Sequence, residues 1–323
     1  MKIKYILLVL ILFMPFLQAK EIKPLYKLTA SGMVVDLLVD EGKLYASTDV
    51  GIVDIFDIAT RKAIGKITLP GTKDFLGDIE PPKIYSIDKF GDKLLMVSQG
   101  EHGFRDVYIY DGKELKRIID SSEEFFIKKG LFVDENRILL GQLSSVIILY
   151  DISKNSIIYK HAIKERRSGG SAFSDMVLSE DRKTVATADE SGEIHLFNVD
   201  DFKHIKLYEG QNLDNIYKID YKQGIVITAG QDRRCAIYKP NGTAYYLPGE
   251  FLIYAAGLSP SGKIGIFAAT INNDLQVFNT DSKSKIALLK GHNATLTDFA
   301  FIGETELFSS ADERNILFWD IKQ

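Results

Sequence analysis

The side chains that could do chemistry are few and scattered along this sequence. The five histidines, at positions 102, 161, 195, 204 and 292, stand singly, whereas a metal or nucleophilic site needs several groups together. Cys235 is the only cysteine and begins an apolar, strand-like run, where a thiol packs as a small hydrophobic group and stays unreactive. The sequence therefore favours neither a metal centre nor a catalytic thiol.

Common catalytic and cofactor motifs are absent as well. The chain has no GxSxG, HExxH or P-loop motif, no GxGxxG after a strand and no CxxCH. Acids such as Asp78, Glu80 and Glu101 fall in loops, where carboxylates are commonly solvated, and no pair has a spacing that indicates acid–base catalysis. We expect a protein that is not an enzyme and needs no cofactor; small-molecule binding or catalysis remains the alternative.

A repeated strand supplies the frame that must carry these loops. Seven apolar segments each end in an aromatic residue at the same place. These aromatic residues are Phe56, Tyr110, Tyr150, Phe197, Tyr238, Phe278 and Trp319. Successive copies lie 54, 40, 47, 41, 40 and 41 residues apart, and a period near 40 is typical of a four-stranded propeller blade.

Each aromatic strand follows two further strand-like runs that are joined by a tight turn. The clearest copy is LIYAAGLSPSGKIGIFAATINNDLQVFNTDSKSKIALL (252–289), which contains four such strands. Comparable turns begin at Asp40, Phe90, Asp134, Ser179 and Ile302. The apolar residues follow period two or run without a break, unlike the 3.6-residue period of a helix. The sequence therefore predicts an all-β, seven-bladed β-propeller.

The last aromatic strand, ILFWDI (316–321), has no outer strand after it. Near the other end, PLYKLTA (Pro24 to Ala30) precedes the first blade and belongs to none. A bare strand edge invites pairing with other chains, so proteins rarely leave one uncovered. We expect the N-terminal strand to complete the last blade, which closes the ring and ties down both termini.

The last blade, GHNATLTDFAFIGETELFSSADERNILFWD, resembles a full repeat of the WD40 family, and degenerate copies extend the resemblance over essentially the whole mature chain. His292 and the glycine before it match the GH pair of the family. Trp319 and Asp320 match its WD pair. The resemblance implies a WD40-like propeller in which these residues have a structural role.

The carboxylate of the WD40 repeat is only partly matched. In the family, an Asp six residues before the Trp position closes a tight turn and bonds the His. Asp232 holds this spacing before Tyr238, whereas Glu313 replaces the Asp before Trp319. The resemblance therefore implies turn-closing roles for Asp232 and Glu313.

Residues 1–19 have the pattern of a secretory signal peptide. Two lysines precede an apolar run from Tyr5 to Leu17, and Ala19 is a small residue just before the expected cut. Residues 20–323 would then form a single domain in the periplasm. Because Leu17 is large for its position before the cut, an uncleaved membrane anchor remains the alternative.

The charge pattern excludes some classes of partner. Loss of the two leader lysines takes the net charge from −4 to −6, with both signs interspersed, which disfavours nucleic acid or an anionic membrane as partner. A single cysteine gives no internal disulfide, so the core must hold the fold, and 46% hydrophobic residues suffice for that. We expect a monomer without stable membrane insertion after cleavage.

Three connections are longer than the repeat requires, at residues 71–83, 98–107 and 164–173. Loops that enter the first and third strands of a blade emerge on the same face, so all three share one rim. Loops carry binding function, and aromatic and arginine side chains are enriched at interfaces. Besides Pro81 and Pro82, these loops contain the predicted protein-binding residues Phe75, His102, Phe104, Arg105, Arg166, Arg167 and Phe173. Alternatively, the phenylalanines pack onto the propeller and the arginines are merely solvated.

As a whole, the chain also resembles periplasmic accessory proteins that are encoded with nitrate reductase. This resemblance implies a non-catalytic platform that serves the maturation or activity of the molybdenum-containing periplasmic nitrate reductase, without holding its cofactor. A scaffold in envelope assembly would use the same loops for a different partner, and a small-molecule-binding or enzymatic propeller remains the third possibility.

Overall fold

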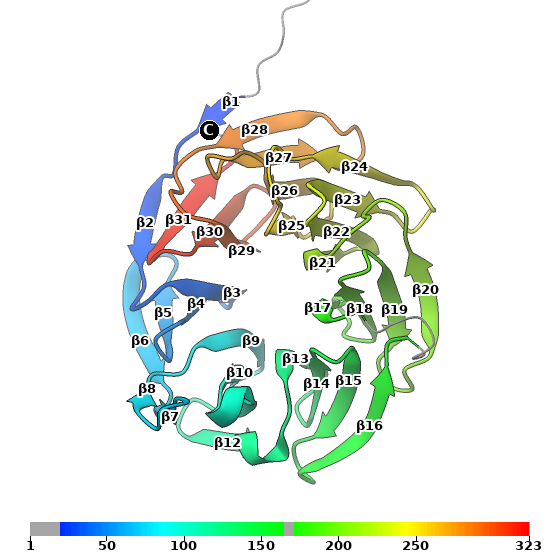
Figure 1. Ribbon diagram of the computed structural model, residues 1–323. Helices are drawn as coiled ribbons and strands as arrows, with labels where there is room; N and C mark the ends of the chain where they lie inside the picture. The colour runs from blue at the N-terminus through cyan, green and yellow to red at the C-terminus, as the bar shows by residue number, and fades with distance from the viewer. Residues whose placement is uncertain (1–19, 165–170, 323) are drawn as a thin grey trace, which may run out of the picture.

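The computed structural model describes residues 20–164 and 171–322. The predicted signal peptide, Arg166 and Arg167 lie outside them. The described chain is all β, with seven sheets of four or five strands arranged as blades around a central channel (Figure 1). The predicted fold class is thereby confirmed. No helix among the described residues is long and apolar enough to cross a membrane.

In blades 1 to 5 the four strands run antiparallel and in sequence order from the channel outward, whereas the outermost strand of blades 6 and 7 comes from the N-terminal segment. Blades 1 to 4 consist of β3 (Val34–Asp40), β4 (Lys43–Thr48), β5 (Ile52–Asp57), β6 (Lys62–Thr68); β9 (Ile84–Phe90), β10 (Lys93–Gln99), β11 (Arg105–Tyr110), β12 (Leu115–Ile119); β13 (Ile127–Phe132), β14 (Arg137–Gln142), β15 (Val146–Asp151), β16 (Ser156–Ala162); and β17 (Phe173–Leu178), β18 (Thr184–Asp189), β19 (Ile194–Asn198), β20 (His204–Tyr208). Blades 5 to 7 consist of β21 (Ile216–Lys222), β22 (Ile225–Gly230), β23 (Arg234–Tyr238), β24 (Ala244–Pro248); β25 (Ala256–Leu258), β26 (Ile264–Ala268), β27 (Leu275–Asn279), β28 (Lys285–Leu289); and β29 (Leu296–Phe301), β30 (Glu306–Ala311), β31 (Asn315–Asp320).

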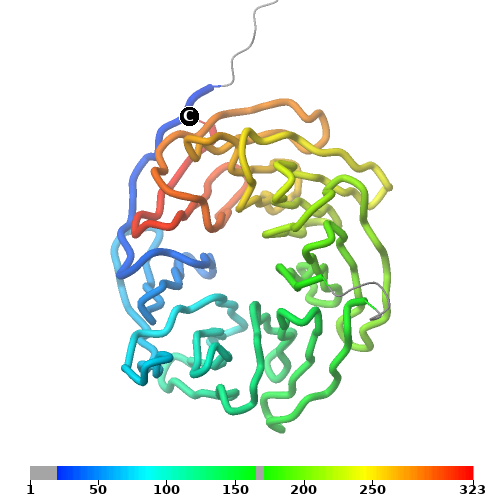
Figure 2. The backbone as a smooth tube through the Cα atoms, in the orientation of Figure 1, coloured from blue at the N-terminus to red at the C-terminus, as the bar shows by residue number. Residues whose placement is uncertain are grey.

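The predicted ring closure is confirmed. β2 (Tyr26–Thr29) pairs antiparallel with β31 as the outer strand of blade 7, with Tyr26 opposite Phe318. The two rings stack at 4.5 Å between centroids. The backbone N–H of Ala30 also donates to the carbonyl of Arg314 at 2.8 Å. Figure 2 shows the start and the end of the described chain side by side.

A second N-terminal strand was not expected from the sequence. β1 (Lys20–Ile22) pairs parallel with β28 and makes blade 6 five-stranded. Ile22 is buried in the core between blades 6 and 7, and its carbonyl accepts a hydrogen bond from Lys290 N at 2.9 Å. The N-terminal segment therefore braces two neighbouring blades.

The hydrophobic core is divided among the joints between blades. The described residues contain seven clusters of buried side chains, and each combines side chains from two neighbouring blades. The repeated aromatic residues lie on the third strands, where all are buried except the half-buried Tyr110. Because no blade has a core of its own, each is stable only between its neighbours, and ring closure protects all seven joints.

The structural repeat of blade 7 forms one chain of hydrogen bonds. Trp319 Nε1 donates to Ser309 Oγ at 2.7 Å, Ser309 Oγ lies 2.6 Å from His292 Nε2, and His292 Nδ1 lies 2.9 Å from Glu313 Oε1. The indole N–H can only donate, so Ser309 Oγ accepts from Trp319 and donates its own proton to His292 Nε2. The proton of the neutral His292 ring is then on Nδ1, which donates to Glu313. Burial lowers the pKa of His292, in keeping with a neutral ring. Asp320 caps the next turn by accepting from Lys322 N at 3.0 Å.

Blade 5 keeps this arrangement with different residues. Asp232 accepts from Leu213 N at 2.8 Å and from Asn212 Nδ2 at 3.2 Å, so it closes its turn as expected. Thr228 Oγ1 donates to Asn212 Oδ1 at 2.7 Å, and Tyr238 OH accepts from Gln211 N at 3.2 Å. Asn, Thr and Tyr therefore replace His, Ser and Trp, which explains how a degenerate sequence keeps the same blade geometry.

The Ser309→Ala variant is expected to lose about 2–4 kcal/mol of unfolding free energy. It leaves two buried polar atoms, Trp319 Nε1 and His292 Nε2, without their shared partner, and each unsatisfied group costs about 1–3 kcal/mol. Urea unfolding followed by Trp319 fluorescence measures the change. Ser282→Ala, in an exposed turn, is the control; equal midpoints for the two variants would contradict a stabilising role for the network.

Candidate functional site

The two faces of the propeller differ in their loops. One face, which we call the loop rim, carries the blade-to-blade connections and the loops between second and third strands. Hydrogen bonds join the two kinds of loop, as from Gln99 N to Lys83 O and from Leu143 N to Phe126 O. The opposite face, the turn rim, carries the remaining short turns. The described parts of the three enlarged loops therefore share the loop rim, as predicted.

Large exposed hydrophobic side chains are distributed unevenly between these faces. Those at the loop rim are Met33, Phe75, Leu76, Ile79, Phe126, Leu143, Leu213, Phe251 and Ile271. The others lie on the outer strands and at Leu25, and none of those in the described residues lies in a turn of the turn rim. Exposed apolar groups that gather on one face indicate an interaction surface.

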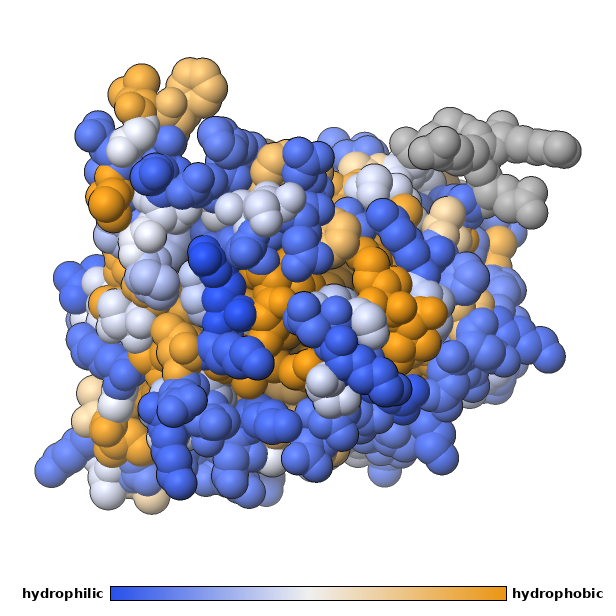
Figure 3. Space-filling view, turned by 90° about the horizontal axis from the view of Figure 1, so that it is seen from below, coloured by the Kyte–Doolittle hydropathy of each residue, from blue (hydrophilic) through white to orange (hydrophobic). Residues whose placement is uncertain are grey.

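The most exposed apolar side chains sit on a small hairpin formed by β7 (Thr72–Lys73) and β8 (Ile79–Glu80). Phe75 is 97% exposed and Leu76 is 83% exposed. Figure 3 shows a hydrophobic projection at its upper left, on the side where Figure 1 places the β7–β8 hairpin. The tip is held in shape, since Asp74 Oδ1 accepts from Leu76 N at 2.8 Å and from Asp78 N at 2.9 Å. The hairpin thus presents these side chains to solvent on an ordered turn.

A second apolar cluster lies at the joint of blades 2 and 3. Phe104 follows a 3-10 turn (Glu101–Gly103) and packs on Phe126 at 4.7 Å between ring centroids. Phe126 follows another such turn (Ser121–Glu123) and is 43% exposed. The predicted residue Phe104 is thus half-buried, and the neighbouring Phe126 presents more apolar surface.

The other predicted binding residues have different environments. His102 is exposed on the loop rim with a left-handed φ of 56°. Arg105 stacks on Tyr85 at 4.3 Å and donates to the carbonyls of Gly103 and Phe104, so it braces its own loop. Burial lowers the pKa of Arg105. The prediction for Phe173 was wrong, because it begins β17 and is only 1% exposed.

Phe173 is unavailable to a partner because of its packing. Its ring lies in the core between blades 3 and 4, directly against Gly141, where there is no room for a Cβ. The end of a long loop and the start of an inner strand look alike in sequence, and this position belongs to the strand. The loop rim in turn contains Leu76, Phe126, Leu213 and Phe251, which sequence reasoning missed. Their signal is a large apolar residue between turn-forming or acidic residues, as in DFLGD and QNLDN.

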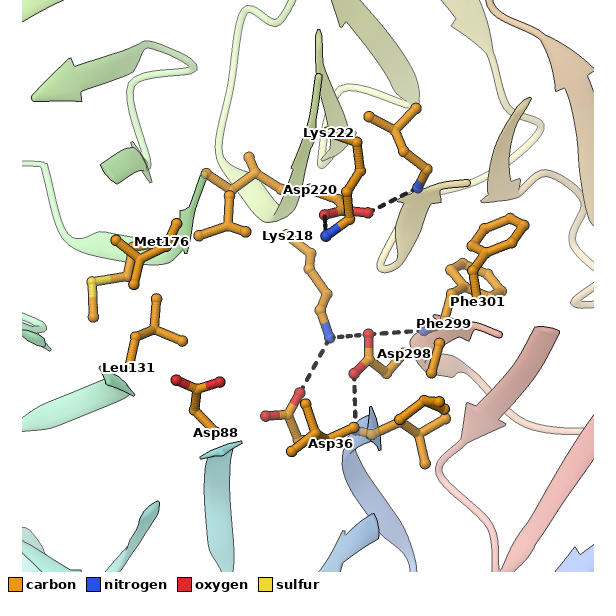
Figure 4. Close-up of a pocket in the computed structure, with 18 of the residues that line it drawn as sticks. Asp36, Asp88, Leu131, Met176, Lys218, Asp220, Lys222, Asp298, Phe299 and Phe301 are labelled. Carbon is orange, nitrogen blue, oxygen red and sulfur yellow. Dashed lines mark hydrogen bonds and ion pairs between the residues drawn. The ribbon is translucent and has the colours of Figure 1, made fainter. Parts of the chain in front are cut away.

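The central channel contains a cavity of about 550 Å³ in its half nearer the turn rim. Leu131, Met176, Leu258, Phe299 and Phe301 contribute apolar walls. Charged side chains reach in from several blades (Figure 4). The cavity is thus of a size suited to a small molecule, but its charged groups already face one another.

The Lys218 ammonium links two inner strands at the centre of this network. Its Nζ lies 2.5 Å from Asp298 Oδ1 and 3.7 Å from Asp36 Oδ1 (Figure 4). Lys129 Nζ lies 3.8 Å from Asp36 and 3.7 Å from Asp175. Burial raises the pKa of Asp36 to about 7, which the ammonium of Lys129 opposes and Asp298 reinforces. Despite its burial, Asp298 has a lowered pKa because of the nearby Lys218 ammonium.

The same carboxylates also join adjacent blades through the backbone. Asp36 Oδ2 accepts from Ile87 N of blade 2 at 3.0 Å, and Asp298 Oδ2 accepts from Leu37 N of blade 1 at 2.9 Å. Asp88, Asp175 and Asp220 make equivalent bonds to the next blade. The channel aspartates therefore have a structural role that accounts for their burial, and the described residues contain no group of acids, His or Cys suited to a metal ion.

No model of a known protein family matches the chain, and no curated protein matches it. The architecture established by the structure is a seven-bladed β-propeller, a fold that commonly serves as a binding platform.

Proposed function

We propose that this protein is a non-catalytic platform for another protein, which binds at the loop rim. The observation that carries the proposal is the β7–β8 hairpin, where Phe75 and Leu76 are almost fully exposed on an ordered turn. Exposing such side chains costs solvation free energy in the free protein. A partner that buries them recovers it without having to order a flexible loop, which favours tight binding.

The partner that we propose is the molybdenum-containing periplasmic nitrate reductase. Support comes from the signal-peptide pattern of residues 1–19, the WD40-like repeat around His292 and Trp319, and the overall likeness of the sequence to the accessory protein NapL. On this proposal the protein acts in the periplasm on the maturation or activity of the reductase. The alternative, a scaffold in envelope assembly, would engage the same rim with a different partner.

The Phe75→Ser, Leu76→Ser double variant is expected to capture at least about tenfold less partner than the wild type, because it removes the apolar anchors of a central contact. The tagged mature protein is recovered from the periplasm of its own host grown anaerobically with nitrate, and co-purified nitrate reductase is quantified. The melting temperature should not change, since neither side chain packs in the core.

The matched control is Ile157→Ser with Ile158→Ser, which removes two exposed apolar side chains from the outer strand β16. Capture by this control should equal that of the wild type. Undiminished capture by the hairpin variant would remove the loop rim as the contact surface. If the hairpin variant loses a partner other than nitrate reductase, the platform stands and the assignment of nitrate reductase is wrong.

A further inference from the structure

Exposed carboxylates accompany the apolar groups of the loop rim. Asp78 and Glu80 share the hairpin with Phe75, and Glu123 and Glu124 precede Phe126. Leu213 is followed by the exposed Asp214, and Phe251 is preceded by the exposed Glu250. The pattern recurs at four separate connections between blades, so it is a property of the rim.

The charges of the described part of the rim show the same bias. Glu190, Glu209 and Asp312 add three exposed carboxylates to the six just described. The exposed cations among the described residues of this rim are Lys73, Lys128, Arg233 and Arg314, together with Lys23 in the link between β1 and β2. The described part of the loop rim is therefore acidic as well as apolar. At the turn rim, exposed acids such as Glu41 and Asp92 alternate with exposed cations such as Lys183 and Lys263.

We propose that the loop rim receives a segment of the partner protein that carries Lys or Arg beside large apolar side chains. This inference rests on the proposed function and specifies its partner. Apolar side chains of the segment would bury Phe75, Phe126 and Phe251, while its cations would meet the flanking carboxylates. Complementary charge of this kind accelerates encounter and rejects partners of the wrong sign.

The same charges disfavour two other occupants. An anionic membrane surface attracts basic segments and repels an acidic rim. A second copy of this chain placed face to face would bring like charges together around each apolar cluster, which costs binding free energy. A basic and apolar protein segment meets neither obstacle.

Three labelled peptides of about twelve residues test the inference, with the repeats Lys-Leu-Ser, Glu-Leu-Ser and Lys-Ser-Ser. Fluorescence anisotropy should show that the Lys-Leu-Ser peptide binds the mature protein at least about tenfold more tightly than the other two, because only it meets both the charge and the apolar surface. Equal affinity for the acidic peptide, or for the peptide without leucine, would overturn the inference.

The binding site is tested by removing charge from one face at a time. The variant Asp78→Asn, Glu80→Gln, Glu123→Gln, Glu124→Gln should weaken Lys-Leu-Ser binding about tenfold. The control Glu41→Gln, Asp92→Asn, Glu135→Gln, Glu306→Gln removes the same charge from exposed positions of the turn rim and should bind as the wild type does. Equal losses in both variants would mean that net charge, and no site on the loop rim, attracts the peptide.

These results separate the inference from the proposed function. If the hairpin variant loses its natural partner while the peptides bind alike, the platform stands and the basic, apolar segment is wrong. If the peptides discriminate as expected while the hairpin variant captures its partner normally, the rim has the inferred preference and the proposed contact surface is wrong.

Discussion

A truncated chain that begins at Ser31, and so lacks β1 and β2, is expected to lose cooperative folding. Truncation removes Ile22 and Leu28 from two inter-blade cores and uncovers the edge of β31. Burial of each such side chain contributes about 1.5–3 kcal/mol, and each lost ladder hydrogen bond about 0.5–1.5 kcal/mol. Their sum approaches the roughly 5–15 kcal/mol of a whole domain. Circular dichroism during heating should show no sharp transition.

A point variant tests the same closure in a chain that still folds. Leu28→Ala leaves a cavity at the joint of blades 7 and 1 and should cost about 2–5 kcal/mol of unfolding free energy. Lys27→Ala, on the same strand but exposed, should change it by less than about 0.5 kcal/mol. Melting curves of the truncated chain and Leu28→Ala that match the wild type would show that the ring does not depend on the N-terminal strand.

Most of the fold could be predicted because the blade repeat leaves a strong local signal. Aromatic residues such as Phe278 and Trp319 recur on third strands, and their burial at inter-blade joints explains the spacing. The pairing of β2 with β31 also followed from a missing outer strand. β1 could not be predicted, because three residues, Lys20–Ile22, show no periodicity and their parallel pairing with β28 is a tertiary contact.

The location of the candidate site could be predicted from the sequence better than the side chains that are exposed on it. Loop lengths placed the rim, and Phe75 was found because it lies in the longest connection. Whether an aromatic side chain stays exposed depends on neighbours distant in sequence: Phe173 meets Gly141, and Arg105 meets Tyr85. The channel network was not foreseen, since Asp36, Lys218 and Asp298 come from blades 1, 5 and 7 and meet only once the ring has closed.

Removal of the channel ammonium by Lys218→Met should destabilise the protein by about 3–5 kcal/mol at pH 8, because breaking a buried ion pair leaves charge without compensation. Asp298 loses its 2.5 Å contact, and Asp36 keeps only Lys129 at 3.8 Å. Lys222→Met is the matched control, since this half-buried lysine faces Asp220 at 3.7 Å and should cost less than about 1 kcal/mol.

The loss of unfolding free energy in the Lys218→Met variant relative to the wild type, which we call its deficit, should become smaller as the pH falls to 6. Without the ammonium, the two facing carboxyls cannot both ionise cheaply, so the folded state holds a proton that the unfolded state releases near its ordinary pKa. A folded state that binds more protons loses stability as the pH rises through its raised pKa. In the wild type Asp36 already has a pKa of about 7. Loss of Lys218 raises this carboxyl pKa further, so the pH range over which stability falls extends to higher pH. Urea unfolding at both pH values measures this; a deficit that is larger at pH 6, or equal for both lysine variants, would mean that Lys218 does not compensate Asp36 and Asp298.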